Sequence, residues 1–270
     1  MKKQLIHLIM VVLVGGFSSC NSGYENDIEE NGREIDFRIN ISHTRTVTEE
    51  KVTTFVPEDR IGIFGIERGG TKTFNKNVEY TYTGGNEWTA KPAITFPITG
   101  EVVDFYAYYP YGTYESTTFD FAVLTDQSAD NGYAISDLLM AKNTTAQLND
   151  EFIALQFTHA MAMIEVKPVF PEGADVELHT VKMTAVRIAE VDIVRQTANV
   201  KAGIEAEEIT LCKVGEGVYR AVVPVQILKG RILEFAGINK SIGLSAVYDY
   251  SLTQEKTLVA NSITTFTIHL

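Results

Sequence analysis

Histidine and cysteine are common nucleophiles and metal ligands, and this chain has five histidines and two cysteines. The histidines stand singly, at His7, His43, His159, His179 and His269. None of them has the short spacing to another ligand that zinc sites use. His159 lies in the apolar run 157–161, where a hydrogen-bonded core histidine is a simpler interpretation than a functional one. The sequence therefore predicts no metal site and no cofactor.

Catalytic motifs are the next source of chemistry, and the chain lacks the usual ones. It has no His-Glu-x-x-His, no Gly-x-Ser-x-Gly and no phosphate-binding glycine loop. Cys212 has no histidine near it in sequence, which favours an inert cysteine in a strand. Paired catalytic carboxylates cannot be recognised before the facing strands are known. We predict that the chain is not an enzyme, and an unrecognised hydrolase on a β-sandwich is an alternative.

Cys20 is a candidate for a different chemistry, the attachment of a lipid anchor. Lys2 and Lys3 precede an apolar run at 5–14, and small residues lead into Cys20, as in an export signal. The segment Phe17-Ser18-Ser19-Cys20 resembles a bacterial lipobox, in which the signal is cut before a cysteine that receives acyl chains. An ordinary export signal is the alternative. We predict a signal at residues 1–19, a lipidated Cys20, a flexible tether at 20–33 and an outer-membrane lipoprotein at the cell surface.

The charge balance restricts the partners. The formal net charge is -12, and removal of residues 1–19 takes away two lysines and no acid, which gives -14. Proteins that neutralise phosphates need clustered Lys and Arg, and this chain does not supply them. Nucleic-acid binding is therefore not expected.

Strand patterns dominate the rest of the chain. In the segment 34–42, Ile35, Phe37, Ile39 and Ile41 alternate with polar residues, which predicts a strand with one buried face. Further strands are expected at 60–66, 78–83 and 102–109. Prolines and a glycine at 168–173 favour a domain boundary, so we predict an all-β fold with one β-sandwich at 34–168 and a second at 169–270.

A tyrosine-rich stretch around the strand 102–109 contains Tyr106, Tyr108, Tyr109 and Tyr111. Aromatic faces stack well on sugar rings, so these side chains are a candidate ligand face. Packing within a sheet explains the pattern equally well.

Several blocks together resemble the fimbrillin family, the subunits of type V pili. They occur in the family's order and cover almost all of the mature chain: FVPEDRIGIF at 55–64, VDFYAYYPY at 103–111, SDLLMAK at 136–142, LQFTHAMAMIEV at 155–166, YRAVVPVQ at 219–226 and the closing segment 257–270. The resemblance implies two transthyretin-like β-sandwich domains, secretion as a lipoprotein and polymerisation with other fimbrial subunits, of the same or another kind.

The resemblance also implies a mechanism of assembly. An Arg-specific surface protease cuts after an early strand, that strand leaves, and a strand of a neighbouring subunit fills the vacated groove. The matching cleavage site here is Arg45 and Thr46, which follow the strand that carries Ile35, Phe37, Ile39 and Ile41. Loops of this kind are where proteases reach a folded protein.

The final strand has the same alternation, with Phe266, Ile268 and Leu270 on one face. It could serve as the donor strand for a neighbour, or it could complete the second sandwich. Because little chain follows it, we expect a tip, anchor or accessory subunit rather than a main shaft subunit. The alternative function is a surface lipoprotein that binds glycans through the tyrosine-rich strand.

Overall fold

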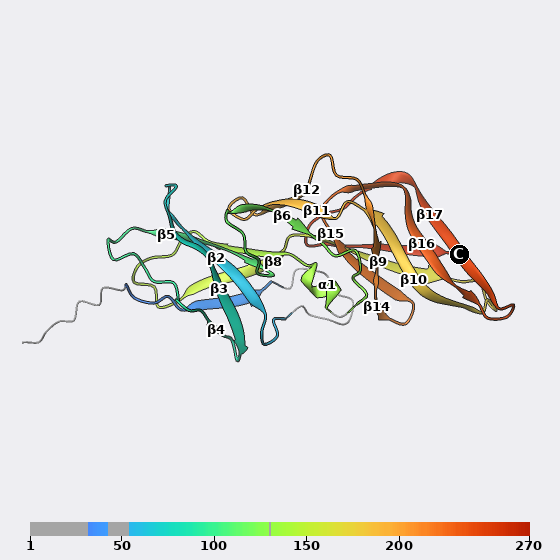
Figure 1. Ribbon diagram of the computed structural model, residues 1–270, viewed down its shortest axis with the longest axis horizontal. Coiled ribbons are helices and arrows are strands. Elements are labelled where there is room, and N and C mark those ends of the chain that lie inside the picture. Colours follow the sequence, from blue (N-terminus) through green and yellow to red (C-terminus); the bar gives the residue numbers. More distant parts are fainter. Residues whose placement is uncertain (1–31, 43–53, 130) are drawn as a thin grey trace, which may run out of the picture. The chain divides into compact units, whose positions relative to one another are not determined.

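The computed structural model describes residues 32–42, 54–129 and 131–270 (Figure 1). Apart from one four-residue helix, α1 (Gly132–Ile135), the regular elements of these residues are strands. The all-β fold class predicted from the sequence is therefore confirmed. No helix in this part of the chain is long and apolar enough to cross a bilayer.

The first half of the chain forms a seven-stranded sheet in the order β1-β8-β7-β5-β2-β3-β4. Its strands are β1 (Phe37–Ile41), β2 (Arg60–Glu67), β3 (Thr73–Gly84), β4 (Glu87–Thr89), β5 (Val103–Tyr109), β7 (Leu139–Asn143) and β8 (Ile153–His159). Every neighbouring pair is antiparallel except β1 and β8, which run parallel.

The remaining strands form two four-stranded sheets and one three-stranded sheet. One has the order β13-β10-β16-β17, built from β10 (Val176–Ala185), β13 (Glu207–Thr210), β16 (Ile227–Asn239) and β17 (Leu244–Thr257). The other has the order β14-β15-β9-β18, from β9 (Ala162–Val169), β14 (Cys212–Gly215), β15 (Val218–Val223) and β18 (Ile263–His269). The small sheet joins β6 (Thr118–Ala122), β11 (Ile188–Asp192) and β12 (Thr197–Val200).

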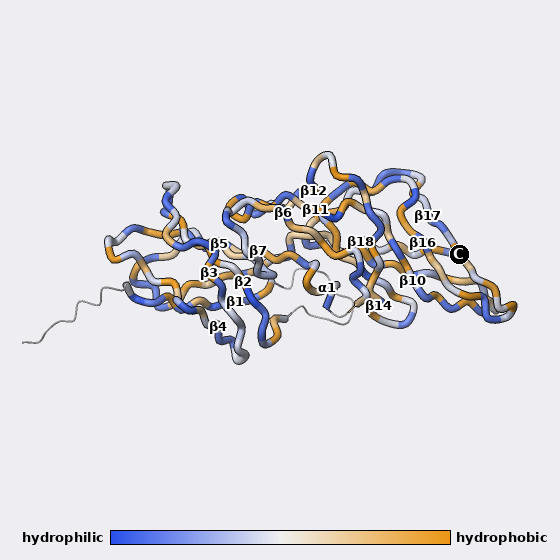
Figure 2. The backbone as a smooth tube through the Cα atoms, viewed as in Figure 1, coloured by the Kyte–Doolittle hydropathy of each residue, from blue (hydrophilic) through white to orange (hydrophobic). Residues whose placement is uncertain are grey.

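Hydrophobic and hydrophilic stretches alternate along the chain in Figure 2. The buried apolar side chains form two cores. The first, called the β1 core, contains the inward side chains of β1 packed with residues such as Ile63, Phe105, Leu155 and Phe157. The second, called the main core, contains inward side chains of the four-stranded sheets, such as Ile164, Val166, Phe235, Phe266 and Ile268.

Strand β5 contains Tyr106, Tyr108 and Tyr109 of the tyrosine-rich stretch. All seven of its residues are buried, because both of its faces are covered. Phe105 and Tyr109 belong to the β1 core, whereas Tyr106 and Tyr108 point the opposite way and belong to the main core.

The predicted boundary between residues 168 and 169 falls inside β9, which pairs with β15 and β18 on its two sides. The division into two sandwiches at this point stays a prediction.

Candidate subunit-docking site along the first strand

The strand β1 lies at the edge of its sheet and pairs with β8 from Phe37 opposite Ile153 to Ile41 opposite Phe157. The backbone N–H of Ile153 donates to the carbonyl of Asp36 at 2.8 Å, and the N–H of Ser42 donates to the carbonyl of Phe157 at 2.7 Å. The strand therefore forms its ladder with one neighbour only, so its departure would leave the outer backbone groups of β8 unpaired.

All four inward side chains predicted for this strand are buried. Ile35, Phe37, Ile39 and Ile41 are 4, 4, 6 and 9% exposed. The ring of Phe37 makes edge contacts with Tyr80 and Phe105, at centroid distances of 5.5 and 5.2 Å. These contacts show that the segment completes a hydrophobic interior.

Tyr80 lies beneath Phe37 as a polar member of this core. Its hydroxyl accepts a hydrogen bond from the backbone N–H of Ile94 at 2.9 Å. Burial raises the pKa of Tyr80 to about 12, so the phenol stays protonated and neutral under β1 over the physiological range.

The outward face of β1 is polar and exposed. The guanidinium of Arg38 lies 3.7 Å from the centroid of the Phe152 ring, a cation–π contact with the residue just before β8. Asp36 lies 3.9 Å from Arg38 in a solvent-exposed ion pair that adds little. The interactions that keep β1 in the sheet are therefore mainly the burial of its inward side chains and its backbone hydrogen bonds to β8.

The predicted lipidation residue Cys20 and the predicted cleavage residues Arg45 and Thr46 lie outside the described residues. Ser42 is the last described residue before that cleavage site, and the description resumes at Thr54. Lipidation and processing at these positions stay predictions.

The closing strand β18 occupies a position related to that of β1. It also lies at a sheet edge and runs parallel to its neighbour, from Ile263 opposite Met163 to His269 opposite Val169. Phe266 and Ile268 are buried in the main core, and Leu270 is half-buried, with its N–H donating to the carbonyl of Val169 at 2.9 Å. In this chain, β18 is therefore the paired edge strand of its own sheet and packs in the main core.

The four tyrosines proposed as a ligand face do not lie together on a surface. Tyr106, Tyr108 and Tyr109 are 8, 0 and 9% exposed, and they alternate between the two cores. The hydroxyl of Tyr108 contacts the side-chain oxygen of Asn77 at 2.8 Å and the carbonyl of Gly112 at 2.6 Å. Tyr111 is half-buried, and the guanidinium of Arg60 lies 5.7 Å from the centroid of its ring. Because the other three rings are buried and cannot stack on sugars, the structure corrects the predicted four-tyrosine face in favour of packing.

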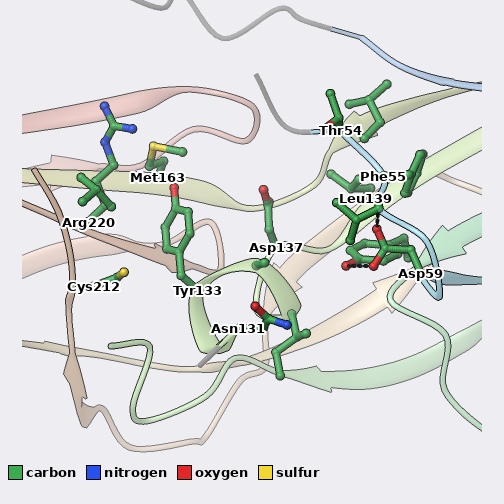
Figure 3. Close-up of a pocket in the computed structure, with 16 residues that line it drawn as sticks. Thr54, Phe55, Asp59, Asn131, Tyr133, Asp137, Leu139, Met163, Cys212 and Arg220 are labelled. Atoms are coloured by element: carbon green, nitrogen blue, oxygen red, sulfur yellow. Dashed lines mark hydrogen bonds between the residues drawn. The ribbon is translucent and has the colours of Figure 1, made fainter. Parts of the chain in front are cut away.

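A cavity of about 430 Å³ opens directly beyond the end of β1 (Figure 3). In Figure 3, Phe55, Asp59 and Leu139 approach it from one side, and Met163, Cys212 and Arg220 from the other. Its remaining lining residues are Ile41, Thr54, Val56, Tyr109, Asn131, Tyr133, Ala134, Ile135, Asp137 and Val214.

Two carboxylates at this cavity are held by neighbouring groups. Asp59 accepts the backbone N–H of Val56 at 2.8 Å and the hydroxyl of Tyr109 at 3.1 Å. Asp137 lies 2.8 Å from Nδ1 of His159, and both side chains are almost fully buried. The histidine that stood out in the sequence is thus part of a buried polar pair.

Glu165 forms a second buried polar group, beside the cavity residue Arg220. One carboxylate oxygen accepts from Nε and Nη2 of Arg220, at 2.9 and 2.7 Å, and the other lies 2.8 Å from Nζ of Lys167. Burial opposes ionisation of Glu165, but Lys167 and Arg220 outweigh it and hold its pKa below the usual range. In the described part of the chain, no group of three or more His, Cys, Asp or Glu side chains is placed to hold a metal.

Comparison with known proteins decides the family. The family model described as fimbrillin-like matches residues 44–270. The chain belongs to the fimbrillin-like family. Because this is a family of structural fimbrial and adhesion proteins, membership confirms the prediction that the chain is not an enzyme.

One curated relative of this fimbrillin-like chain is a proposed fimbrium tip subunit, Fim1C, of Bacteroides ovatus. The two are 31% identical over 182 residues, which is 59% of this chain. The match spans only 34% of the length of that relative.

Solved structures share the fold. A proposed cell adhesion protein from Bacteroides uniformis matches with a TM-score of 0.63 and 24% identity, over 80% of this chain and 88% of that one. Another from Bacteroides ovatus matches with a TM-score of 0.67 and 15% identity, over 88% and 92%. A fimbrial protein from Bacteroides ovatus gives a TM-score of 0.55 and 19% identity, over 88% of this chain and 48% of that one.

Proposed function

We propose that this fimbrillin-like chain is a tip, anchor or accessory subunit of a cell-surface fimbria that contributes to adhesion and is joined to its neighbour by strand exchange. An Arg-specific protease cuts after Arg45, β1 leaves, and a strand of a neighbouring subunit takes its place along β8. Acyl chains on Cys20 hold the protein at the outer membrane until β1 and its tether are released.

The observation that carries this proposal is the combination of deep burial and simple attachment in β1. The side chains of Ile35, Phe37, Ile39 and Ile41 are at most 9% exposed, and the ladder of β1 is with β8 alone. The residues just before β1 add two backbone hydrogen bonds, from the N–H of Ile35 to the carbonyl of Ile94 at 2.9 Å and from the N–H of Phe96 to the carbonyl of Arg33 at 3.0 Å. Because β1 is also the first strand of the described residues, one cut three residues after Ser42 would separate it covalently from the later strands that pack on it.

The energetics favour replacement over an empty groove. Burying a large apolar side chain is worth about 1.5–3 kcal/mol, and the segment that would leave buries four, Ile35 just before β1 and Phe37, Ile39 and Ile41 within it. The vacated edge of β8 would also expose unpaired N–H and C=O groups, which an added strand can satisfy. A strand with the same alternation restores both kinds of interaction.

The tip, anchor or accessory role rests on two observations. β18 is paired with β9 and buried in this chain's own main core, so it is not a spare strand. The curated relative that covers part of the chain is a proposed fimbrium tip subunit.

The test is the variant Arg45→Ala, with Lys51→Ala as a matched control in the same segment. We expect the wild type and Lys51→Ala to be shortened by an Arg-specific protease, to show a new N-terminus at Thr46 and to enter surface polymers. Arg45→Ala should stay uncut and unassembled. Normal assembly of uncut Arg45→Ala would contradict the proposal.

A further inference from the structure

The edge on which β1 lies continues into the second half of the molecule. Strands β8 and β9 are separated only by Ala160 and Met161, and β1 and β18 run parallel to them. The backbone carbonyl of Phe157 accepts a hydrogen bond from the N–H of Ser42 at 2.7 Å, and that of Met161 accepts one from the N–H of Asn261 at 3.0 Å. Alternate carbonyls of a strand face the same edge, so the carbonyl of His159 is the one that lies between those of Phe157 and Met161 on this edge. A strand in the place of β1 could therefore extend about two residues beyond Ile41 before it met Asn261.

The inward face of that extension leads to the cavity. Side chains of a strand alternate, so the next inward position after Ile41 is two residues farther on. Ile41, Tyr109 and Leu139 belong to the β1 core and also line the cavity. A fifth inward side chain would therefore leave the core and enter the cavity.

The lining selects the kind of side chain. Phe55, Leu139 and Met163 provide apolar walls. Asp59 and Asp137 are already engaged by Tyr109 and His159, and a third carboxylate beside them would be repelled. The volume of about 430 Å³ exceeds what one side chain needs and is in the range of ligand pockets, about 300–1,000 Å³. A large, neutral, apolar side chain fits these conditions best.

The chain's own sequence does not provide such a residue. The apolar alternation at Ile35, Phe37, Ile39 and Ile41 is followed by His43 at the fifth position. A replacement strand that merely copied β1 would gain nothing over it. A strand with an apolar fifth residue would gain one more buried side chain, and this gain would drive the exchange in one direction.

We propose that the cavity beyond β1 is the receptor for the fifth inward side chain of an extended segment from a neighbouring fimbrial subunit. That segment carries five apolar residues at alternate positions, the last of them large and uncharged. This inference rests on the proposed strand exchange and identifies the feature that makes the incoming strand bind more tightly than β1.

The experiment uses the full mature chain cut once after Arg45, with both pieces still associated and the single cut verified by intact mass. Three labelled peptides covering Glu34–His43 compete with the bound N-terminal piece: the native sequence, His43→Leu and His43→Asp. We expect His43→Leu to bind about tenfold to a hundredfold more tightly than the native peptide, as burial of one large apolar side chain implies. His43→Asp should bind more weakly than the native peptide.

A protein variant that fills the cavity provides the second readout. Ala134 lines the cavity and is exposed, so Ala134→Phe blocks the space with little effect on folding. It should remove the preference for His43→Leu over the native peptide. Ala122→Phe, also at an exposed alanine but in β6, should keep the preference.

The outcomes separate the two proposals. If no peptide displaces the N-terminal piece, strand exchange itself is wrong. If all three peptides bind equally well, or if Ala134→Phe leaves the preference intact, strand exchange stands and the fifth-residue receptor is overturned.

Discussion

The strands β1 and β18 are alike in position and different in how they are held. Each lies at the edge of a sheet and runs parallel to one of two consecutive strands, β8 and β9. β1 and the residues just before it bury every second residue from Ile35 to Ile41, whereas in β18 only Phe266 and Ile268 are buried. The segment proposed to leave is therefore the one with more buried apolar side chains.

This difference shows that detachability is not a matter of weak packing. β1 precedes the rest of the sheet in the chain, so a single cut removes it with its packing surface. β18 follows the long hairpin of β16 and β17 and stays joined to it. A well-packed strand that leaves creates a strong acceptor, which a loosely packed one would not.

The largest expected effect compares one buried residue on each strand in the chain cut after Arg45. Phe37→Ala removes a ring that contacts Tyr80 and Phe105, a change that costs about 3–5 kcal/mol at buried sites. We expect the N-terminal piece to bind at least ~100-fold more weakly. Ile268→Ala should lower the free energy of unfolding by about 2–4 kcal/mol and leave retention of that piece unchanged, because Ile268 packs in the main core.

The measurements are release of the labelled N-terminal piece and urea unfolding of the uncut protein. Asn40→Ala, on the exposed face of β1, is the control for a substitution on the strand. Equal release of the piece from Phe37→Ala and Asn40→Ala would contradict the comparison, as would rapid release from Ile268→Ala.

The sequence predicted β1 and β18 well because each has one buried face. Alternation of apolar and polar residues then identifies the inward set directly, as at Phe37 and Ile268. The strand β5 shows the limit of this reasoning. Both of its faces are buried, so Tyr106 and Tyr109 looked alike in sequence although they belong to different cores.

The cavity could not be predicted, because its walls come from segments far apart in the chain. Phe55, Leu139, Met163 and Arg220 meet only after the sheets have formed. Gln127 was missed for a related reason. It lies in a polar stretch, but its fully buried amide bonds the backbone N–H and carbonyl of Val222, each at 2.8 Å. A side chain that replaces a strand partner leaves no periodic signal.

A smaller effect is expected from the buried carboxylate beside β18. Glu165→Gln weakens the charged contacts to Arg220 and Lys167 and should lower the free energy of unfolding by about 2–3 kcal/mol at neutral pH. β1 has no buried charged counterpart, since its ion pair between Asp36 and Arg38 is exposed.

The pH dependence follows from the lowered pKa of Glu165. A carboxyl with a lower pKa in the folded state stabilises the protein fully above its unfolded pKa, and this stabilisation is lost as the pH falls through the folded value. Thermal unfolding of wild type and Glu165→Gln should therefore differ most near neutral pH and converge in acid. A difference that persists or grows in acid would show that Glu165 acts by packing alone.

The smallest effect tests whether β18 has a polar attachment that β1 lacks. Thr265 lies directly opposite Glu165 in the ladder between β18 and β9. Its hydroxyl donates a hydrogen bond to the Glu165 carboxylate at 3.3 Å. Thr265→Val should lower the free energy of unfolding by about 0.5–1 kcal/mol relative to Thr267→Val, an exposed position on the same strand with the same change in β propensity. If Thr265 bonds the ionised carboxylate, Thr265→Val and Thr267→Val should lower the free energy of unfolding equally when each is made separately in the Glu165→Gln protein. If Thr265→Val still costs more than Thr267→Val by the same amount in the Glu165→Gln protein, the cost does not come from the hydrogen bond to Glu165. The contrast between β1 and β18 would then rest on apolar burial alone.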